Sequence, residues 1–194
     1  DAFGIAFAQT IPETMAKTPR LPLPIPVRMG LVGHNGVPVS FRLSSNGPLA
    51  NEHVVLVTDN TQLQPVYPET NGKIVPSLLR NFSAPVILQD DLNSSERLHL
   101  LAHDADMFNR WDATQTLLAD QILATANDQA GAVDELAMDA LGDALTNALA
   151  SSNLLDMFKC GLLTLPAIAV LESRMKPADP VALFNARRKI EANL

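Results

Sequence analysis

The stretch LPIPVRMGLVGHNGVPVSFRL, residues 23–43, predicts that the first half of this chain is built from β-strands. Its apolar runs 27–33 and 37–43 flank the pair Asn35-Gly36, which supplies the positive φ angles of a tight hairpin turn. In the second run, apolar residues alternate with other residues, and a period of two is typical of a half-buried strand. We therefore expect the two runs to pair with each other across the turn.

Further segments on both sides extend this β pattern. The runs 3–12 and 52–60 are short and apolar, and 73–89 is an extended segment interrupted by Pro76 and Pro85. Proline cannot donate a hydrogen bond to a strand ladder, so this last segment suits an edge or sheet-switching strand. Several short strands about ten to fifteen residues apart favour a small antiparallel, immunoglobulin-like β-sandwich. The chain has one cysteine, so no intramolecular disulfide can stabilise that core.

The second half predicts helices. Eleven of the 14 prolines lie before residue 90, and most alanines lie after it. Asn93 followed by Glu96 forms a capping-box pattern, and apolar residues recur at helical spacing over 106–126 and 133–150. The fold predicted is therefore β then α, with a β-sandwich domain at 1–91 and an all-α stack of about six short antiparallel helices at 92–194.

Capping signals and periodicity also predict details of these helices. Ser151 or Ser152 should cap one helix, and Pro166 and Pro180 should each be a first helical residue, Pro180 after a capping Asp179. The buried face of 133–150 should consist of apolar residues at helical spacing, namely Leu136, Ala140, Leu141, Ala144, Leu145 and Ala148.

Charge and composition restrict the classes of function. The net charge of −7 argues against nucleic acid and anionic membranes as partners. The chain shows neither a membrane-spanning apolar run nor a signal peptide, and Cys160 alone fits a reducing compartment, so we expect a cytoplasmic protein. It begins at Asp1 rather than Met, which suggests a processed product or an excised piece.

His99 and His103 form the most distinctive candidate metal site. Residues four apart share a helix face, so both imidazoles could meet one metal ion, with Asp104 and Asp106 close in sequence. The helical zinc-hydrolase motif is H-E-x-x-H, and its general-base Glu is replaced here by Leu100. A zinc site also needs a third ligand, so we favour ordinary helix histidines.

The other candidate residues are predicted to be structural. His34 falls in the predicted turn and His53 at a strand start, while Cys160 is expected to be a buried thiol near a helix C-terminus. Trp111 should lie on the apolar face of its helix, with Arg110 and Asp112 positioned to bridge to neighbouring elements. A basic run at 186–189 should form a solvated face. The sequence contains neither a G-x-S-x-G elbow nor a phosphate-binding loop.

Three stretches carry a resemblance to a known family. VPSLLRNFSAPVIL (75–88), LLAHDADMFNRWDATQTLL (100–118) and LTLPAIAVLESRMKPADPVAL (163–183) resemble, in order and spacing, the back half of bacterial aminopeptidase N, a family of gluzincin zinc metallopeptidases. The resemblance implies the small β-sandwich and the first helices of the C-terminal helical domain. His103 matches a histidine of the family that is not a ligand, and His99 has no counterpart.

The resemblance implies an activity that these residues do not carry. The family's H-E-x-x-H and G-x-M-E-N motifs are absent, so no catalytic, cofactor-binding or metal residue can be assigned here. We therefore expect the chain alone to be inactive, whereas a catalytic domain in the same polypeptide would hold zinc and remove N-terminal amino acids from peptides. The sandwich would link the catalytic and helical domains, and the helices would help to enclose the active site.

Two alternatives and one structural expectation stay open. The chain could be a free-standing protein-interaction module, or a small metal-dependent enzyme that uses His99 and His103. If the helical domain is cut short, its last helix would also lose neighbours. Exposed Leu183, Phe184 and Ile190 would then drive self-association.

Overall fold

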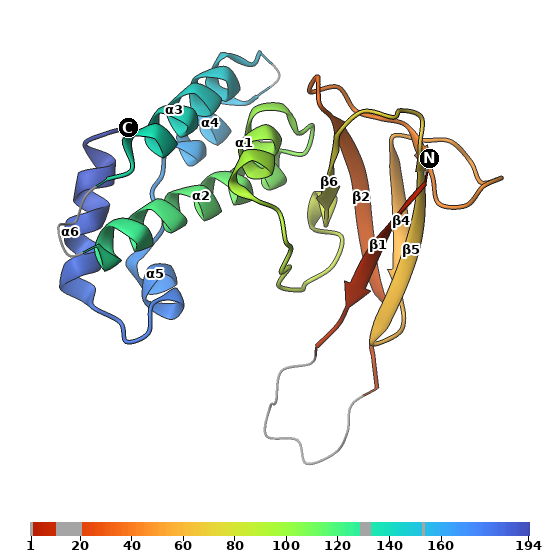
Figure 1. Cartoon of the computed structure of the whole chain (residues 1–194), viewed down its shortest axis with the longest axis horizontal. Helices are drawn as coiled ribbons and strands as arrows, with labels where there is room; N and C mark the ends of the chain where they lie inside the picture. The colour runs from red at the N-terminus through yellow and green to blue at the C-terminus, as the bar shows by residue number, and fades with distance from the viewer. Residues whose placement is uncertain (1, 11–20, 129–132, 153) are drawn as a thin grey trace. The chain divides into compact units, whose positions relative to one another are not determined.

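The computed structural model describes residues 2–10, 21–128, 133–152 and 154–194. It divides into two compact units, Asp1–Asp90 and Asp91–Leu194. Figure 1 shows strands in the first unit and helices in the second. The predicted order, β then α, is confirmed.

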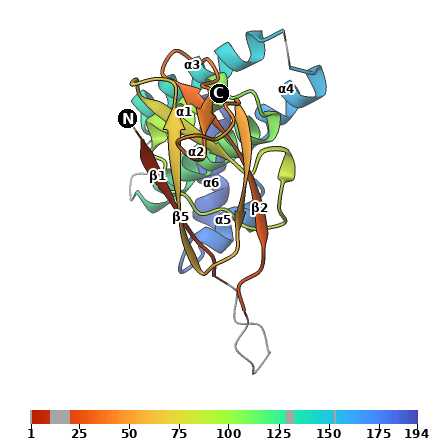
Figure 2. The same ribbon diagram turned by 90° about the vertical axis from the view of Figure 1, so that its right-hand side faces the viewer.

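The first unit consists of two antiparallel three-stranded sheets with the strand orders β1-β5-β3 and β4-β2-β6. In Figure 2 the strands β1 and β5 lie beside each other, and β2 belongs to the other sheet. The predicted antiparallel sandwich is thus confirmed. The strand bounds are β1 Phe3–Ala8, β2 Ile25–Gly33, β3 Phe41–Arg42, β4 Glu52–Val57, β5 Thr61–Pro68 and β6 Ile74–Leu78.

Alternation along the strands builds the core between the sheets. On β1, Phe3, Ile5 and Phe7 pack towards the core, and the residues between them are exposed. Side chains from both sheets complete an apolar layer, as expected for a packed sandwich. Its buried members are Val27, Met29, Leu31, Phe41, Val55, Val57, Val66, Leu79 and Ala84.

The predicted pairing of 27–33 with 37–43 is wrong beyond the tip of the turn. The turn itself forms, with Gly36 at a φ of 77° and the Gly33 N–H donating to the Val37 carbonyl. Pairing then stops after a bridge between Val32 and Pro38. Strands β4 and β6 pair with β2 instead, and the returning chain crosses to the other sheet, where Phe41 pairs with β5. Turn chemistry therefore predicted the reversal but not the strand partner.

Strand β5 carries no clear strand signal in the sequence. Its apolar Leu63 is 70% exposed, whereas Gln62 and Gln64 lie on the face that pairs with core residues of β1. Both glutamine side chains donate to backbone carbonyls, at 3.1 Å from Gln62 Nε2 to Leu56 O and 3.0 Å from Gln64 Nε2 to Leu43 O. These hydrogen bonds let polar residues occupy the inner face.

The second unit contains six α-helices among its described residues, as predicted. Helix α2 contacts α1, α3, α4 and α6, and is therefore the centre of the unit. None of the helices in the described part of the chain is both long and apolar enough to cross a membrane. The helix bounds are α1 Ser94–His103, α2 Met107–Asn127, α3 Glu135–Ala150, α4 Asp156–Leu162, α5 Ile168–Arg174 and α6 Pro180–Glu191.

Two predicted helix starts are confirmed and two are wrong. Asn93 and Glu96 form the reciprocal capping box of α1, and Asp179 caps α6 with Pro180 in the first turn. Neither Ser151 nor Ser152 caps α4, because Ser151 ends α3 and α4 begins after Leu155. Pro166 likewise precedes α5 by two residues, since Ala167 is the N-cap.

The burial of side chains on α3 and α6 differs from two further expectations. On α3, Leu136 is 81% exposed, and Met138 takes its place on the buried face. On α6, Leu183 and Ile190 are fully buried within the unit, where α6 packs on α2 and α5, while Phe184 is about half-exposed. The expectation that Leu183 and Ile190 drive self-association is therefore wrong, because their apolar surface is already covered.

Candidate functional site

The candidate histidine pair lies on one face of α1. The ring centroids of His99 and His103 are 4.9 Å apart and the rings are tilted by 54°. His99 is half-buried and His103 is exposed at the end of the helix. The predicted juxtaposition of the two imidazoles is therefore confirmed, and a metal site would need further donors beside them.

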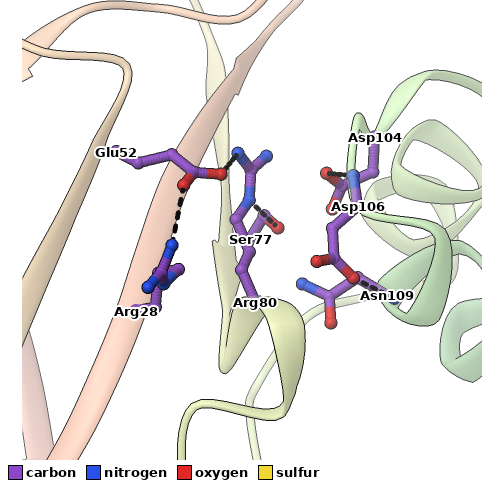
Figure 3. Close-up of polar contacts among 7 residues, drawn as sticks. All are labelled: Arg28, Glu52, Ser77, Arg80, Asp104, Asp106 and Asn109. Atoms are coloured by element: carbon purple, nitrogen blue, oxygen red, sulfur yellow. Dashed lines mark hydrogen bonds and ion pairs between the residues drawn. The ribbon is translucent and has the colours of Figure 1, made fainter.

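The neighbouring carboxylates are used to shape the connection between α1 and α2. The Asp106 N–H donates to Asp104 Oδ1 at 3.0 Å, and the Asn109 N–H donates to Asp106 Oδ1 at 3.0 Å, which caps the N-terminus of α2 (Figure 3). Both aspartates are buried. Capping satisfies a helix N–H that would otherwise lack an acceptor. These contacts explain the acidic residues without a metal ion.

Arg110, on α2, forms hydrogen bonds with backbone carbonyls of α1. Its guanidinium donates from Nε to the Leu101 carbonyl at 2.8 Å and from Nη2 to the Ala102 carbonyl at 3.1 Å. The predicted bridge from Arg110 to a neighbouring helix is confirmed. Burial lowers the pKa of Arg110, and the Asp104 carboxylate opposes this effect. A cation beside the last carbonyls of α1 also complements the helix dipole.

The described residues do not fit the zinc centre that the family resemblance implies for the whole enzyme. Within those residues, no group of three or more His, Cys, Asp or Glu side chains is placed to hold a metal ion. Two imidazoles fall short of the three protein ligands of a catalytic zinc site. The nearby Arg110 cation would also repel a divalent metal.

His103 should make the stability of the second unit depend on pH. Partial burial at the end of α1, then the nearby His99 and Arg110 charges, lower the pKa of the largely exposed His103. Between this lowered pKa and the usual value of about 6.5, the unfolded chain binds more protons than the folded chain. Stability is therefore full above about pH 6.5 and falls as the pH drops below it.

Urea unfolding between pH 5 and pH 7.5 checks this expectation. His103→Gln should flatten the pH dependence in this window, and His99→Gln should flatten it less, because it removes only one of the three causes. His34 lies in the other unit, so His34→Gln is the control and should leave the pH dependence of the second unit unchanged. Equal pH dependence in the parent chain and His103→Gln would contradict the assignment.

The remaining histidines and the cysteine lie apart from this pair in the sequence, and each has its own environment. His53, at the start of β4 as predicted, has Nε2 2.8 Å from the Phe41 carbonyl and its ring edge-on to Phe41 at 4.7 Å, so it supports the sandwich core. His34 is exposed in the predicted turn. The prediction that Cys160 is buried is wrong, because the short helix α4 turns this thiol outward.

The tryptophan cluster is structural in its contacts. Trp111 is half-buried on α2 and lies beside Phe108, with ring centroids 5.6 Å apart. Asp112 is exposed on the same helix. In the basic run, Arg188 and Lys189 are exposed as predicted, whereas Arg187 donates from Nε to the Pro166 carbonyl at 3.2 Å.

Sequence reasoning missed the ion pair between the buried Arg80 and Glu52 in the sandwich. Arg80, in the short 3-10 helix η1 (Arg80–Phe82), donates from Nη1 to Glu52 Oε1 at 2.9 Å and from Nε to Ser77 Oγ at 2.8 Å (Figure 3). Arg28 extends the cluster to the other Glu52 oxygen at 3.7 Å. A lone arginine in an apolar segment was the only signal available. Its partners are up to 28 residues away and cannot be read from local pattern.

Comparison with family models divides the chain close to the boundary between the two units. Residues 1–91 match a domain of unknown function described as an Ig-like fold (DUF3458). Residues 94–194 match a second one, described as ARM repeats (DUF3458_C).

Three relatives carry the same type of name. Aminopeptidase N of Caulobacter vibrioides is 37% identical over 152 residues, which is 78% of this chain and 17% of that protein. Aminopeptidase N of Escherichia coli is 27% identical over 100% of this chain and 22% of its own length. The crystal structure of Legionella pneumophila aminopeptidase A in complex with aspartic acid superposes with a TM-score of 0.67 at 25% identity, covering 88% of this chain and 19% of that one. The chain thus spans about a fifth of the length of these relatives.

Proposed function

Because the chain belongs to the bacterial aminopeptidase N family, with its Ig-like and ARM-repeat domains in tandem, we propose that it is a non-catalytic part of a zinc-dependent aminopeptidase. One observation carries the proposal. The whole chain aligns with about a fifth of the Escherichia coli enzyme, and its sequence contains neither an H-E-x-x-H nor a G-x-M-E-N motif. The zinc and the peptide-cleaving groups would then belong to a catalytic domain elsewhere in the same polypeptide.

Within that enzyme the two domains would act mechanically. The sandwich, 1–91, would hold the helical domain that begins at residue 92 against the catalytic domain. The helices would help to enclose the active site, which limits access to peptide N-termini and excludes water. Support comes from the helix caps and the buried arginines of the two units, which suit a rigid scaffold. The cytoplasmic location expected from the single cysteine stays a prediction that cell fractionation would test.

The proposal predicts that the purified chain does not hydrolyse an alanyl chromogenic amide, with or without added zinc. It also predicts that the chain can replace the aligned fifth of the Escherichia coli enzyme with activity retained, because only the scaffold is exchanged. Deletion of that fifth without replacement is the control and should abolish activity. Turnover by the isolated chain that a chelator stops would overturn the proposal and favour the metal-dependent alternative. A folded but inactive chimera would favour a free-standing interaction module.

A further inference from the structure

The sequence contains three Asn-Gly dipeptides, and all of them lie in turns of the first unit. They are Asn35-Gly36, Asn46-Gly47 and Asn71-Gly72. Asparagine followed by glycine deamidates spontaneously, because glycine has no Cβ to hinder the approach of its backbone nitrogen to the asparagine side chain. This covalent change alters both charge and backbone, so the site at which it occurs matters for the fold.

The reaction requires a particular geometry at the asparagine. The glycine nitrogen forms a bond to the asparagine Cγ, the Cγ–Nδ2 bond breaks, and ammonia leaves with the proton that the glycine nitrogen loses. Water then adds to either carbonyl of the resulting succinimide ring. Opening at Cγ gives Asp, and opening at the backbone carbonyl carbon gives isoaspartate, in which the chain runs through the former side chain. Solvent water is the co-reactant, and nothing is oxidised or reduced.

The turn at Asn35 is closed by two hydrogen bonds. The Gly36 N–H donates to the Gly33 carbonyl at 2.8 Å, and the Val37 N–H donates to Asn35 Oδ1 at 3.2 Å. Asn35 is therefore the third residue of a β-turn, where φ and ψ are fixed, and its side chain is held as well. Attack by the Gly36 nitrogen requires Asn35 to rotate, so this turn must open before the ring can form.

The turn at Asn46 is closed in a similar way. The Gly47 N–H donates to the Ser44 carbonyl at 3.1 Å, which places Asn46 at the third position of a second β-turn. A Cβ added to Gly47 would lie 2.8 Å from Ser44 Oγ, so the two ends of the turn are in close contact. Ring closure at Asn46 therefore also requires a backbone hydrogen bond to break first.

The turn at Asn71 is held differently. The Gly72 N–H donates to Thr70 Oγ1 at 3.1 Å rather than to a backbone carbonyl. A hydroxyl holds a turn more weakly than a backbone acceptor, and rotation of the Thr70 side chain releases the N–H. Within the described part of the chain, no hydrogen bond restrains the Asn71 side chain. The Gly72 nitrogen can therefore reach the Asn71 Cγ without the loss of a backbone hydrogen bond of the turn.

We propose that Asn71 is a deamidation site of the folded chain, which converts to Asp and isoaspartate ahead of Asn35 and Asn46. The change falls just before β6. Isoaspartate lengthens the backbone shortly before Lys73, whose carbonyl accepts a 2.9 Å hydrogen bond from the His34 N–H. The new carboxylate also adds a negative charge to a chain whose net charge is −7. Conversion at Asn71 therefore loosens the contact between this turn and the end of β2.

Peptide mapping by mass spectrometry tests the site preference. The 194-residue chain is incubated in slightly alkaline buffer, once folded and once unfolded in urea, and Asp and isoaspartate are quantified at all three sites over time. In the folded chain, Asn71 should convert roughly threefold to tenfold faster than Asn35 or Asn46, which is the effect of one backbone hydrogen bond that must open. In urea the three rates should become similar, because the closed turns are lost.

Hydrogen exchange tests the structural consequence. After incubation, the His34 amide should exchange faster than in fresh protein, because its bond to the Lys73 carbonyl is disturbed. Asn71→Gln is the matched control: it keeps a side-chain amide but disfavours ring closure. The incubated variant should therefore keep the His34 amide protected, with the rates at Asn35 and Asn46 unchanged.

Three results would overturn the proposal. The first is conversion of Asn35 or Asn46 at least as fast as that of Asn71 in the folded chain. The second is a preference for Asn71 that persists unchanged in urea, since local sequence rather than turn closure would then set the rates. The third is equal loss of protection at the His34 amide in the incubated parent chain and in Asn71→Gln.

Discussion

Gly30→Ala is expected to lower the free energy of unfolding of the sandwich by about 2 to 3 kcal/mol. A Cβ at residue 30 would lie 2.2 Å from Arg80 Cζ and 2.3 Å from Nη1, so the guanidinium must move. Its buried hydrogen bonds to Ser77 and Glu52 would then be lost. Breaking a buried ion pair costs more, about 3 to 5 kcal/mol, but the Glu52 side chain is 39% exposed and water would recover part of that loss.

Urea unfolding followed by circular dichroism measures this cost, and a double-mutant cycle assigns it. In an Arg80→Ala background the Gly30→Ala penalty should vanish, because the overlapping guanidinium is gone. Gly142→Ala is the matched control: it lies within α3, nothing lies within 4 Å of its added Cβ, and it should stabilise the chain by about 0.5 to 1 kcal/mol. A Gly30→Ala penalty that persists without Arg80 would show that the backbone, not the guanidinium, resists the methyl group.

Several features set by neighbouring residues were predictable from the sequence, although the helix starts predicted at Ser151 or Ser152 and at Pro166 were not correct. The Asn93–Glu96 capping box, the Asp179 cap and the Asn35-Gly36 reversal all depend on residues within a few positions of each other. Hydrophobic periodicity likewise predicted the long apolar face of α2. Such signals act through local hydrogen bonds and φ preferences, and tertiary packing did not override them.

Features set by distant partners were not predictable. The choice of β4 and β6 as partners of β2, rather than the hairpin return, depends on competition between strands across the whole unit. Strand β5 was missed because its inner face carries glutamines that donate to backbone carbonyls of other segments. Cys160 was predicted to be a buried structural thiol because the C-terminal end of a helix disfavours a reactive thiolate, but it is exposed on the seven-residue helix α4.

The candidate site likewise has some features that the sequence predicted and others that it did not. The facing of His99 and His103 follows from their spacing on one helix. The roles of Asp104 and Asp106 as turn and cap, and of Arg110 as a cap on the preceding helix, required knowledge of where α1 ends and how α2 leaves it. Asp104 and Asp106 beside two histidines have the residue composition of a metal site. In this chain, however, their carboxylates accept hydrogen bonds that shape the junction between α1 and α2.

Arg110→Ala is expected to lower the free energy of unfolding of the helical unit by about 3 kcal/mol. It removes a buried guanidinium that donates to the Leu101 and Ala102 carbonyls. It also leaves Asp104 without the cation that offsets its charge. Arg110→Lys should recover less than half of the loss, because a single ammonium cannot reproduce the planar fork that reaches two carbonyls. Arg188→Ala, on the exposed face of α6, should change stability by no more than about 0.5 kcal/mol.

Hydrogen exchange locates the effect at the end of α1. The Asp104 N–H donates to Leu100 O at 2.8 Å in the last turn of that helix, and this amide should exchange faster in Arg110→Ala than the loss of global stability alone requires. Amides in the middle of α3, a different helix from the one whose carbonyls accept from Arg110, should follow the global change only. If every amide of the unit accelerated equally, Arg110 would be one more contributor to the packed core. A selective acceleration at Asp104 would identify Arg110 as the residue that fixes the end of α1, and with it the positions of His103, Asp104 and Asp106.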